Sequence, residues 1–417
     1  MKLIEKGWHL IQPNYSTWGT TACKTVLFVL CLSSVALAQP NTTTKPQPNP
    51  PILNPLELPT SGDPLLPNPP IERDLTPLER LRLSEALDEL NNQATAELQA
   101  GNISEAFELW YREIRLRRVL GGQLEEVKTL GRVGEIAWRE NSKKEVQLIT
   151  ARLKSIEQNA ETTGTVDREL LNALGQAYQQ VRVPGQALKI YEQILADTRQ
   201  QQDIEGEIAT LKTMGQLHMA WFDYPKAAAT YQELLAIAQR QGDRANEIVY
   251  TQQLAYIYDQ SNDPKNALQM KERLVELYPS NDPQLPALKI AIATDYEALS
   301  QPEAASQNYQ EAYQKALELQ QLAYGSEALQ KLATLYHTNE QPEVALQIYE
   351  ILVVVEQQSY DFYGLMNTYD RMGQIYLEQK NYNQALELFK QGLELAQSLN
   401  YQETYFFRQI ERVNQQR

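Results

Sequence analysis

Cysteine is nearly absent from this chain of 417 residues. Its two cysteines, Cys23 and Cys31, both lie before residue 39. The rest of the sequence can therefore form neither a disulfide nor a thiolate zinc site, whatever the redox state of its compartment. Histidine is also scarce, and only His218 and His337 lie beyond residue 38. A cysteine nucleophile is excluded there, and two isolated histidines in distant repeats do not form a catalytic pair.

The motifs of common enzymes and an excess of positive charge are also missing. No Gly-rich phosphate loop, H-E-x-x-H or G-x-S-x-G motif is present. The 38 basic and 53 acidic side chains leave a net charge of −15, which repels nucleic acid. The sequence therefore predicts a protein that is not an enzyme and uses no cofactor. We expect its partner to be a protein or peptide with basic flanks.

Long hydrophobic runs are limited to one, at residues 25–38, which follows Lys24 and ends in Ala36-Leu37-Ala38. A basic flank, a short apolar run and an A-x-A end are typical of a secretory signal peptide. We predict a signal peptide over residues 1–38, export to the periplasm, and cleavage after Ala38. Retention as an anchor is the alternative and would be the only membrane contact. Cleavage would leave a net charge of (38 − 3) − (53 − 1) = −17.

Proline is concentrated in one place. Residues 39–77 hold twelve of the 21 prolines, and proline lacks an amide donor and fixes its own φ. We expect residues 39–76 to form a disordered, proline-rich linker.

Beyond residue 76 the sequence repeats. Gly373 is followed by Ala385 twelve residues later and by Phe389 four residues after that. Similar small residues precede Gly373 at steps of 38 to 41 residues, namely Ala333, Ala293, Ala255, Gly215, Gly175, Gly134 and Ala94. Such a period predicts antiparallel pairs of helices, A and B, that approach each other closely at the two small residues. Aromatic side chains would fill the space beside that contact.

Proline marks the beginning of many B helices. Pro184, Pro264, Pro302 and Pro342 each stand three residues before the alanine of helix B. Proline is tolerated at the first helical position, where its missing donor is not needed. Asp263 is a candidate N-cap for the helix that Pro264 begins.

These residues resemble tetratricopeptide repeats (TPRs), in the longer variety of about 40 residues that occurs in kinesin light chains. The resemblance implies an all-α solenoid, a right-handed superhelix with eight hairpins over residues 77–400. A capping helix would follow at 401–417. Lys271 departs from the pattern because it stands where an aromatic is expected. The exported, TPR-only layout is also similar to that of exported cyanobacterial TPR proteins, which would place the chain in the periplasm or the thylakoid lumen.

The resemblance also implies that A-helix residues line a concave groove and bind an extended peptide there. The predicted site consists mainly of amides, which can pair with a peptide backbone of any sequence. Its residues are Asn172, Gln176, Lys212, Gln216, Gln252 and Tyr256. The alternative is that these glutamines belong to a solvated, Gln-rich surface.

A second functional hypothesis is metal handling in an exported assembly factor. Groove-side Asp259, Glu297 and His337 are candidates to hold a divalent cation such as manganese. They lie in three different repeats, which makes a compact set of ligands difficult to form. The carboxylate clamp of chaperone-binding TPRs is matched only by Asn92, Lys128 and Arg132, because its other positions would fall in the linker. Lys128 and Arg132 remain candidates for binding a carboxylate.

Overall fold

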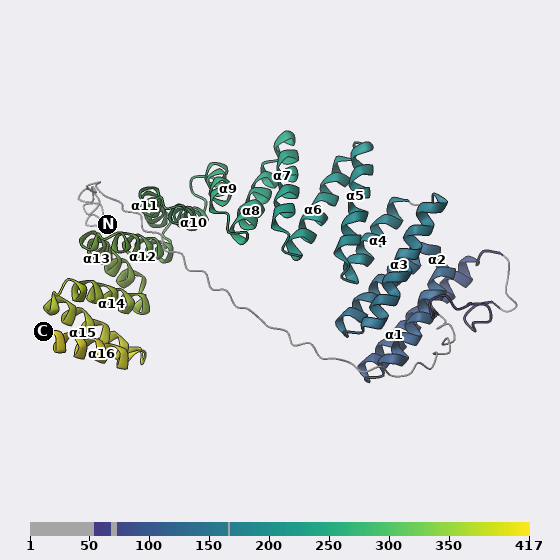
Figure 1. Cartoon of the computed structure of the whole chain (residues 1–417), viewed down its shortest axis with the longest axis horizontal. Helices are drawn as coiled ribbons and strands as arrows, with labels where there is room; N and C mark the ends of the chain where they lie inside the picture. The colour runs from purple at the N-terminus through teal and green to yellow at the C-terminus, as the bar shows by residue number, and fades with distance from the viewer. Residues whose placement is uncertain (1–53, 68–72, 166) are drawn as a thin grey trace, which may run out of the picture. The chain divides into compact units, whose positions relative to one another are not determined.

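The computed structural model describes residues 54–67, 73–165 and 167–417. This part of the chain folds into 16 α-helices and contains no strand (Figure 1). The helices are α1 (Pro77–Gln99), α2 (Ile103–Arg139), α3 (Lys143–Thr163), α4 (Arg168–Gln180), α5 (Pro184–Gln200), α6 (Ile204–Ala220), α7 (Tyr224–Gln241), α8 (Arg244–Gln260), α9 (Pro264–Leu277), α10 (Leu285–Ala298), α11 (Pro302–Glu318), α12 (Leu322–Thr338), α13 (Pro342–Ser359), α14 (Phe362–Glu378), α15 (Tyr382–Ser398) and α16 (Glu403–Gln416). The prediction of an all-α solenoid is confirmed.

Consecutive helices pack as antiparallel hairpins. The A helices are α4, α6, α8, α10, α12 and α14, and the B helix of each pair follows it in the chain. Helix α2 bends at Gly121 and Gly122, whose backbone is not helical. Its first part therefore pairs with α1 as a B helix, and its second part pairs with α3 as an A helix.

The contacts divide the described residues into two compact units. The N-terminal unit ends at Thr230 and the C-terminal unit runs from Tyr231 to Arg417, so that the division falls inside α7. Within each unit a B helix packs on the next A helix, as α5 does on α6 and α13 on α14. Each unit has its own apolar core, which in the C-terminal unit includes the buried rings of Tyr309, Tyr313 and Tyr349.

Helix boundaries follow local sequence signals. Pro184, Pro264, Pro302 and Pro342 are the first residues of α5, α9, α11 and α13, as the sequence predicts. Asp263 caps α9, because its side chain accepts a hydrogen bond from the Asn266 amide at 3.2 Å. Aspartates also cap A helices, namely Asp167, Asp203, Asp243 and Asp361.

The small residues of the repeat lie where two helices touch. A β-carbon on Gly175 in α4 would lie 2.8 Å from Tyr191 Cζ of α5, and one on Gly373 in α14 would lie 2.7 Å from Phe389 Cε1 of α15. Both rings are buried. The small residue on helix A therefore makes room for the ring on helix B.

Lys271 shows how a departure from the pattern is accommodated. It takes the place of the ring in α9 and is 7% exposed. Its Nζ donates to Asp259 Oδ1 of α8 at 2.7 Å and to Asp295 Oδ2 of α10 at 2.8 Å. A buried ion pair thus connects three successive helices where other repeats use an aromatic contact.

The residues before α1 differ in part from what the sequence predicts. The predicted signal peptide at residues 1–38 and the linker up to residue 53 lie outside the described residues. The prediction of a disordered linker is wrong for residues 54–67, because this segment packs on the first helices and Leu56 is fully buried. Within the described ranges, none of the helices has the length and apolar character needed to span a bilayer.

Candidate functional site

The predicted amides of α4 lie on an exposed face of that helix. Asn172 and Gln176 are exposed, while Ala173, Leu174 and Gly175 between them are buried. This alternation follows from the helical period, which places residues four apart on the same face. The α4 amides are therefore available to a ligand, with the tight Gly175 contact on the opposite side.

An open hollow lies between the end of α4 and α6. It is lined by Gln179 and Arg182 on one side and by Thr213, Gln216 and Trp221 on the other. Gln216 is exposed, and Gln179 Nε2 donates to Tyr191 Oη at 2.7 Å, which holds that amide in place. Of the predicted residues, Gln216 lies in this hollow, whereas Lys212 on the same helix is half-buried.

The two predicted residues of α8 belong to the C-terminal unit and differ in availability. Tyr256 is 51% exposed. Gln252 is half-buried and donates through Nε2 to Tyr278 Oη at 2.6 Å. Because one of its donors already pairs within the chain, Gln252 has less capacity for a ligand than Asn172 or Gln216.

A second hollow lies between α12 and α14 and was not part of the predicted site. Its polar lining consists of Gln330, His337, Tyr349, Asn367, Asp370, Arg371 and Gln374. Gln330 and Asp370 stand three residues before Ala333 and Gly373, and Gln374 stands one residue after Gly373. Asn172, Gln176 and Gln216 stand at the same offsets from Gly175 and Gly215, so Gln330, Asp370 and Gln374 occupy equivalent repeat positions.

Asp370 is the most constrained polar group of the α12–α14 hollow. Tyr405 Oη of α16 donates to its carboxylate, at 2.9 Å from Oδ1 and 3.0 Å from Oδ2. Burial raises the pKa of Asp370, and the hydrogen bonds from Tyr405 and Gln374 partly offset this. Arg371 beside it is exposed. The hollow thus offers a carboxylate, a guanidinium and three amides within one surface.

The three residues proposed as metal ligands do not come together among the described residues. Asp259 pairs with Lys271, Glu297 accepts from Tyr309 Oη, and His337 Nε2 lies 3.0 Å from Glu378 Oε2. Among the described residues, no three His, Cys, Asp or Glu side chains converge in a way that could hold a metal ion. The three candidates take part in three separate contacts.

The remaining candidates from the sequence also have partners. His218 lies on α6 and its side chain is buried, which lowers its pKa. Arg132 Nη2 donates to the buried Glu113 at 2.7 Å, and Lys128 lies 3.3 Å from Glu125 Oε1. Neither basic residue is held ready for a carboxylate from outside.

Comparison with known proteins identifies the repeat. One model described as tetratricopeptide repeat matches residues 206–280 and 326–398, and a second model of that description matches residues 170–205. The predicted TPRs are therefore confirmed in these segments. No curated protein matches the chain.

Solved structures similar to the chain are distant. BtubC (BKLC) from P. vanneervenii is 18% identical over 52% of this chain and 92% of its own, with a TM-score of 0.37. A putative kinesin light chain from Podosopora anserina with TPR-like repeats is 15% identical over 46% and 96%, with a TM-score of 0.37. The C-terminal part of a TPR repeat-containing protein from Cytophaga hutchinsonii is 15% identical over 64% and 95%, with a TM-score of 0.39. These scores support no functional conclusion.

Proposed function

We propose that this chain, whose TPRs extend over residues 170–280 and 326–398, is a non-enzymatic scaffold that binds an extended peptide or a partner protein. The observation that carries the proposal is that exposed amides line the two hollows on A helices, Gln216 in one and Gln330 and Asn367 in the other. An amide side chain offers a donor and an acceptor, so it can pair with a peptide backbone in either direction.

In the N-terminal unit the proposed binding residues are Asn172, Gln176 and Gln216, with Lys212 on the same helix as Gln216. In the C-terminal unit they are Gln252 and Tyr256 on α8, which we treat separately. The exposure of four of these six side chains supports their assignment. The half-buried Lys212 and Gln252 make a smaller contribution.

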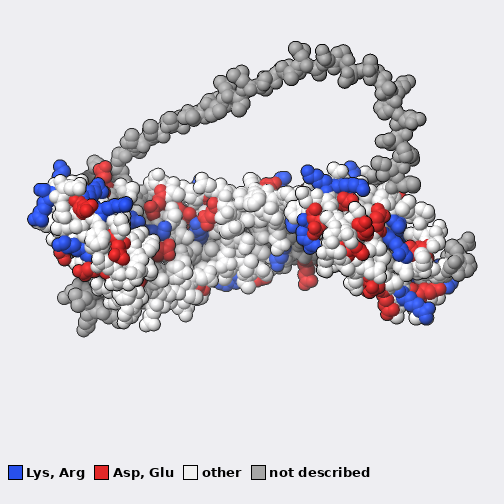
Figure 2. All heavy atoms as spheres, turned by 90° about the horizontal axis from the view of Figure 1, so that it is seen from below, with Lys and Arg blue, Asp and Glu red and all other residues white. Residues whose placement is uncertain are grey.

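The partner carries basic flanks, because the chain has a net charge of −15 and charge complementarity speeds encounter. On the face drawn in Figure 2, acidic and basic side chains are interspersed and do not form a patch of one sign. The charge therefore steers the partner over a distance and does not define the binding surface.

The scaffold is an exported protein with the longer TPR variety. The signal-like residues 25–38 support export. The longer repeat is supported by the first residues of successive A helices, which lie 40 residues apart from Ile204 to Arg244 and from Leu322 to Phe362. N-terminal sequencing of the protein from its native cell should give Gln39 as the first residue. A protein that begins at Met1 in the cytoplasm would contradict export.

The site is tested by a variant that combines Asn172→Ala with Gln216→Ala. The partner is first isolated by crosslinking in the native compartment, and its affinity is then measured for both proteins. Each lost amide pairing should weaken binding by about 1 kcal/mol, while the helical circular dichroism signal and melting temperature stay unchanged. Binding equal to that of the unmodified protein would show that these amides are only a solvated surface. Calorimetry with manganese, calcium and zinc tests the metal alternative separately.

A further inference from the structure

The segment from Asn54 to Pro67, here called the strap, contains one short motif twice. Asn54-Pro55-Leu56 and Asp63-Pro64-Leu65 turn in the same way. In each, the side-chain Oδ1 of the first residue accepts from the leucine amide at 3.0 Å, and its carbonyl accepts from the next amide at 3.0 Å. The strap therefore presents two copies of an Asx-Pro-Leu turn, which forms from local hydrogen bonds alone.

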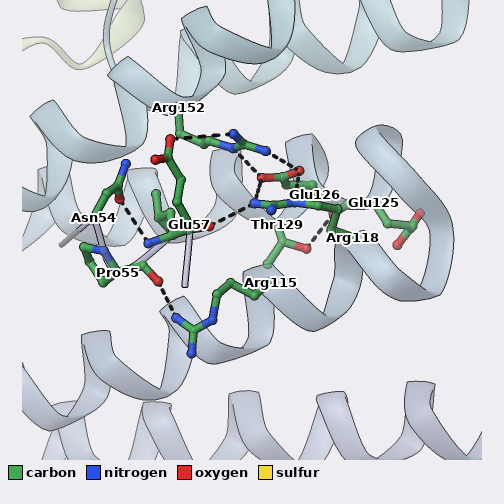
Figure 3. Close-up of polar contacts among 10 residues, drawn as sticks. Asn54, Pro55, Glu57, Arg115, Arg118, Glu125, Glu126, Thr129 and Arg152 are labelled. Carbon is green, nitrogen blue, oxygen red and sulfur yellow. Dashed lines mark hydrogen bonds and ion pairs between the residues drawn. The ribbon is translucent and has the colours of Figure 1, made fainter. Parts of the chain in front are cut away.

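A row of arginines on α2 contacts both turns. Arg112, Arg115 and Arg118 are spaced by three residues, which places them along one side of the helix. Arg112 holds the Asp63 carboxylate with two hydrogen bonds of 2.8 Å, in the bidentate arrangement that favours arginine. The other turn is held through its backbone. Arg115 donates to the Pro55 carbonyl, and Arg118 Nη2 donates to the Leu56 carbonyl at 2.9 Å (Figure 3).

Leucines anchor the strap between these polar contacts. Leu56 of the first turn is 0% exposed. Leu65 and Leu66 of the second turn pack against a cluster of buried leucines, namely Leu83, Leu87, Leu90 and Leu116. Both copies of the motif thus use a leucine in the apolar part of the contact and a backbone or carboxylate oxygen in the polar part.

The receiving face is basic, in contrast to the acidic chain as a whole. Arg118 and Arg152 share the buried carboxylate of Glu126, at 2.6 Å and 2.7 Å (Figure 3). Within the described residues, Arg115 forms no ion pair, and the carboxylate that pairs with Arg112 comes from the strap. The Glu108 carboxylate also acts on Arg115, so the four arginines, Glu108 and Glu126 sum to (+4) + (−2) = +2. The strap supplies two carboxylates, Asp63 and Glu57, the latter 3.9 Å from Arg152.

We propose that this face of α2 and α3 is a binding site for extended acidic peptides that carry Asx-Pro-Leu turns, and that the strap occupies it in cis. The contacts described above come from side chains, and the strap forms no helix or strand with α2. It can therefore leave the face without the unfolding of any helix. Five residues, 68–72, separate the strap from residue 73. So short a connection gives the strap an effective concentration in the millimolar range, and an outside peptide must compete with it.

The direct test uses a fluorescent synthetic peptide with the sequence of residues 54–67 and measures its anisotropy with the full chain. In one variant the strap is released by Leu56→Asp and Asp63→Ala. We expect this variant to bind the peptide about tenfold or more tightly than the unmodified protein, whose site is occupied. Adding Arg112→Ala and Arg115→Ala to the released variant should reduce the affinity about tenfold or more.

Two controls show whether the site is specific. A peptide that itself carries Leu56→Asp and Asp63→Ala should not bind the released variant. Adding Lys128→Ala and Lys143→Ala to that variant removes two positive charges from α2 and α3. Among the described residues neither lysine contacts the strap, and Lys128 pairs with Glu125 and Glu169, so the peptide affinity should stay unchanged. The proposal is overturned if the released variant keeps its helical signal but does not bind the peptide, or if the lysine changes weaken binding as much as the arginine changes.

Hydrogen exchange of the unmodified protein provides a test that needs no variant. The amides of Leu56 and Leu65 should exchange about 100-fold or more faster than those of the middle of α2, because the strap opens alone. Exchange of the strap only together with α2 would contradict the proposal, since the segment would then be an inseparable part of the fold.

Discussion

A single small side chain decides how closely two helices of a hairpin approach. Gly373 is the clearest case, because its Cα faces the ring of Phe389, which is fully buried and has no space to move into. The same contact recurs between Gly175 and Tyr191. The spacing of sixteen residues between the small residue and the ring is therefore a packing requirement, and it was visible in the sequence.

We predict that Gly373→Leu destabilises the protein by about 1–3 kcal/mol, because the added side chain overpacks the contact with Phe389. Gly185 is a matched control, since a β-carbon there would meet no atom within 4 Å. Gly185→Ala should be neutral or slightly stabilising, because it reduces the conformational freedom of the unfolded chain. Urea denaturation measures both, and equal effects of the two changes would contradict the packing argument.

Glu356 is a buried acid near the end of α13. It is 4% exposed. Thr368 Oγ1 donates to its Oε1 at 3.1 Å, while its Oε2 has no hydrogen-bond partner among the described residues. Burial raises the pKa of Glu356 to about 7, and the nearby charge of Asp361 adds to this. The folded protein therefore favours the protonated acid.

The sign of the resulting pH dependence follows from linkage. Well below pH 4.5 the acid is protonated in both states, so it does not change the free energy of unfolding. As the pH rises toward 7, the unfolded chain ionises first and stability falls, by about 3 kcal/mol in total. Glu356→Gln should remove this loss, so that the variant gains stability over the unmodified protein between pH 5 and pH 8 in urea denaturation. A constant difference between the two proteins over that range would contradict the assignment.

At the scale of helices, the ion pair of Lys271 replaces an aromatic contact. Burial raises the pKa of Asp295, although the Lys271 ammonium opposes this. We predict that Lys271→Met destabilises the protein by about 3–5 kcal/mol, because it leaves Asp295 buried without its partner. Adding Asp295→Leu should recover much of that loss. If the double variant is as unstable as the single one, the pair is not the source of the effect.

The helices could be predicted from the sequence, whereas most contacts between segments distant in the chain could not. Pro184 and Asp263 act through neighbours within three residues, so their roles as helix start and N-cap could be read directly. The partner of Lys271 in α10 lies 24 residues away, and no local pattern indicates it. The register contained Gln330 and Gln374 as well as Gln216, but only the fold shows which of these amides line a hollow and that Gln252 already pairs with Tyr278.

The docking of the strap on α2 is another contact that could not be predicted from the sequence. A high proline content predicts an extended chain because proline removes backbone donors. It does not show that the carbonyls of Pro55 and Leu56 have donors on α2, about 60 residues further along the chain. The structure instead shows hydrogen-bonded turns at Asn54–Glu57 and Asp63–Leu66, and these turns dock on α2.

At the scale of the whole molecule, the acidic charge predicts how binding responds to salt. The net charge of −15 should attract a partner with basic flanks at low ionic strength. We predict that the association rate falls steeply between about 10 mM and 150 mM salt, as the Debye length shortens from about 30 Å to 8 Å, while the dissociation rate changes little. Stopped-flow kinetics with the isolated partner checks this. An association rate that does not depend on salt would contradict the role assigned to charge.

We infer that a partner binds along the A helices. Site-specific photocrosslinking in the native cell tests it most directly, with a photoreactive residue placed at Gln216 or Gln374 on A helices, and at Ala196 or Lys390 on exposed positions of the B helices α5 and α15. We predict that Gln216 and Gln374 give a discrete adduct with the same partner and that Ala196 and Lys390 give none. Adducts from the B-helix positions alone would show that the partner does not bind along the A helices.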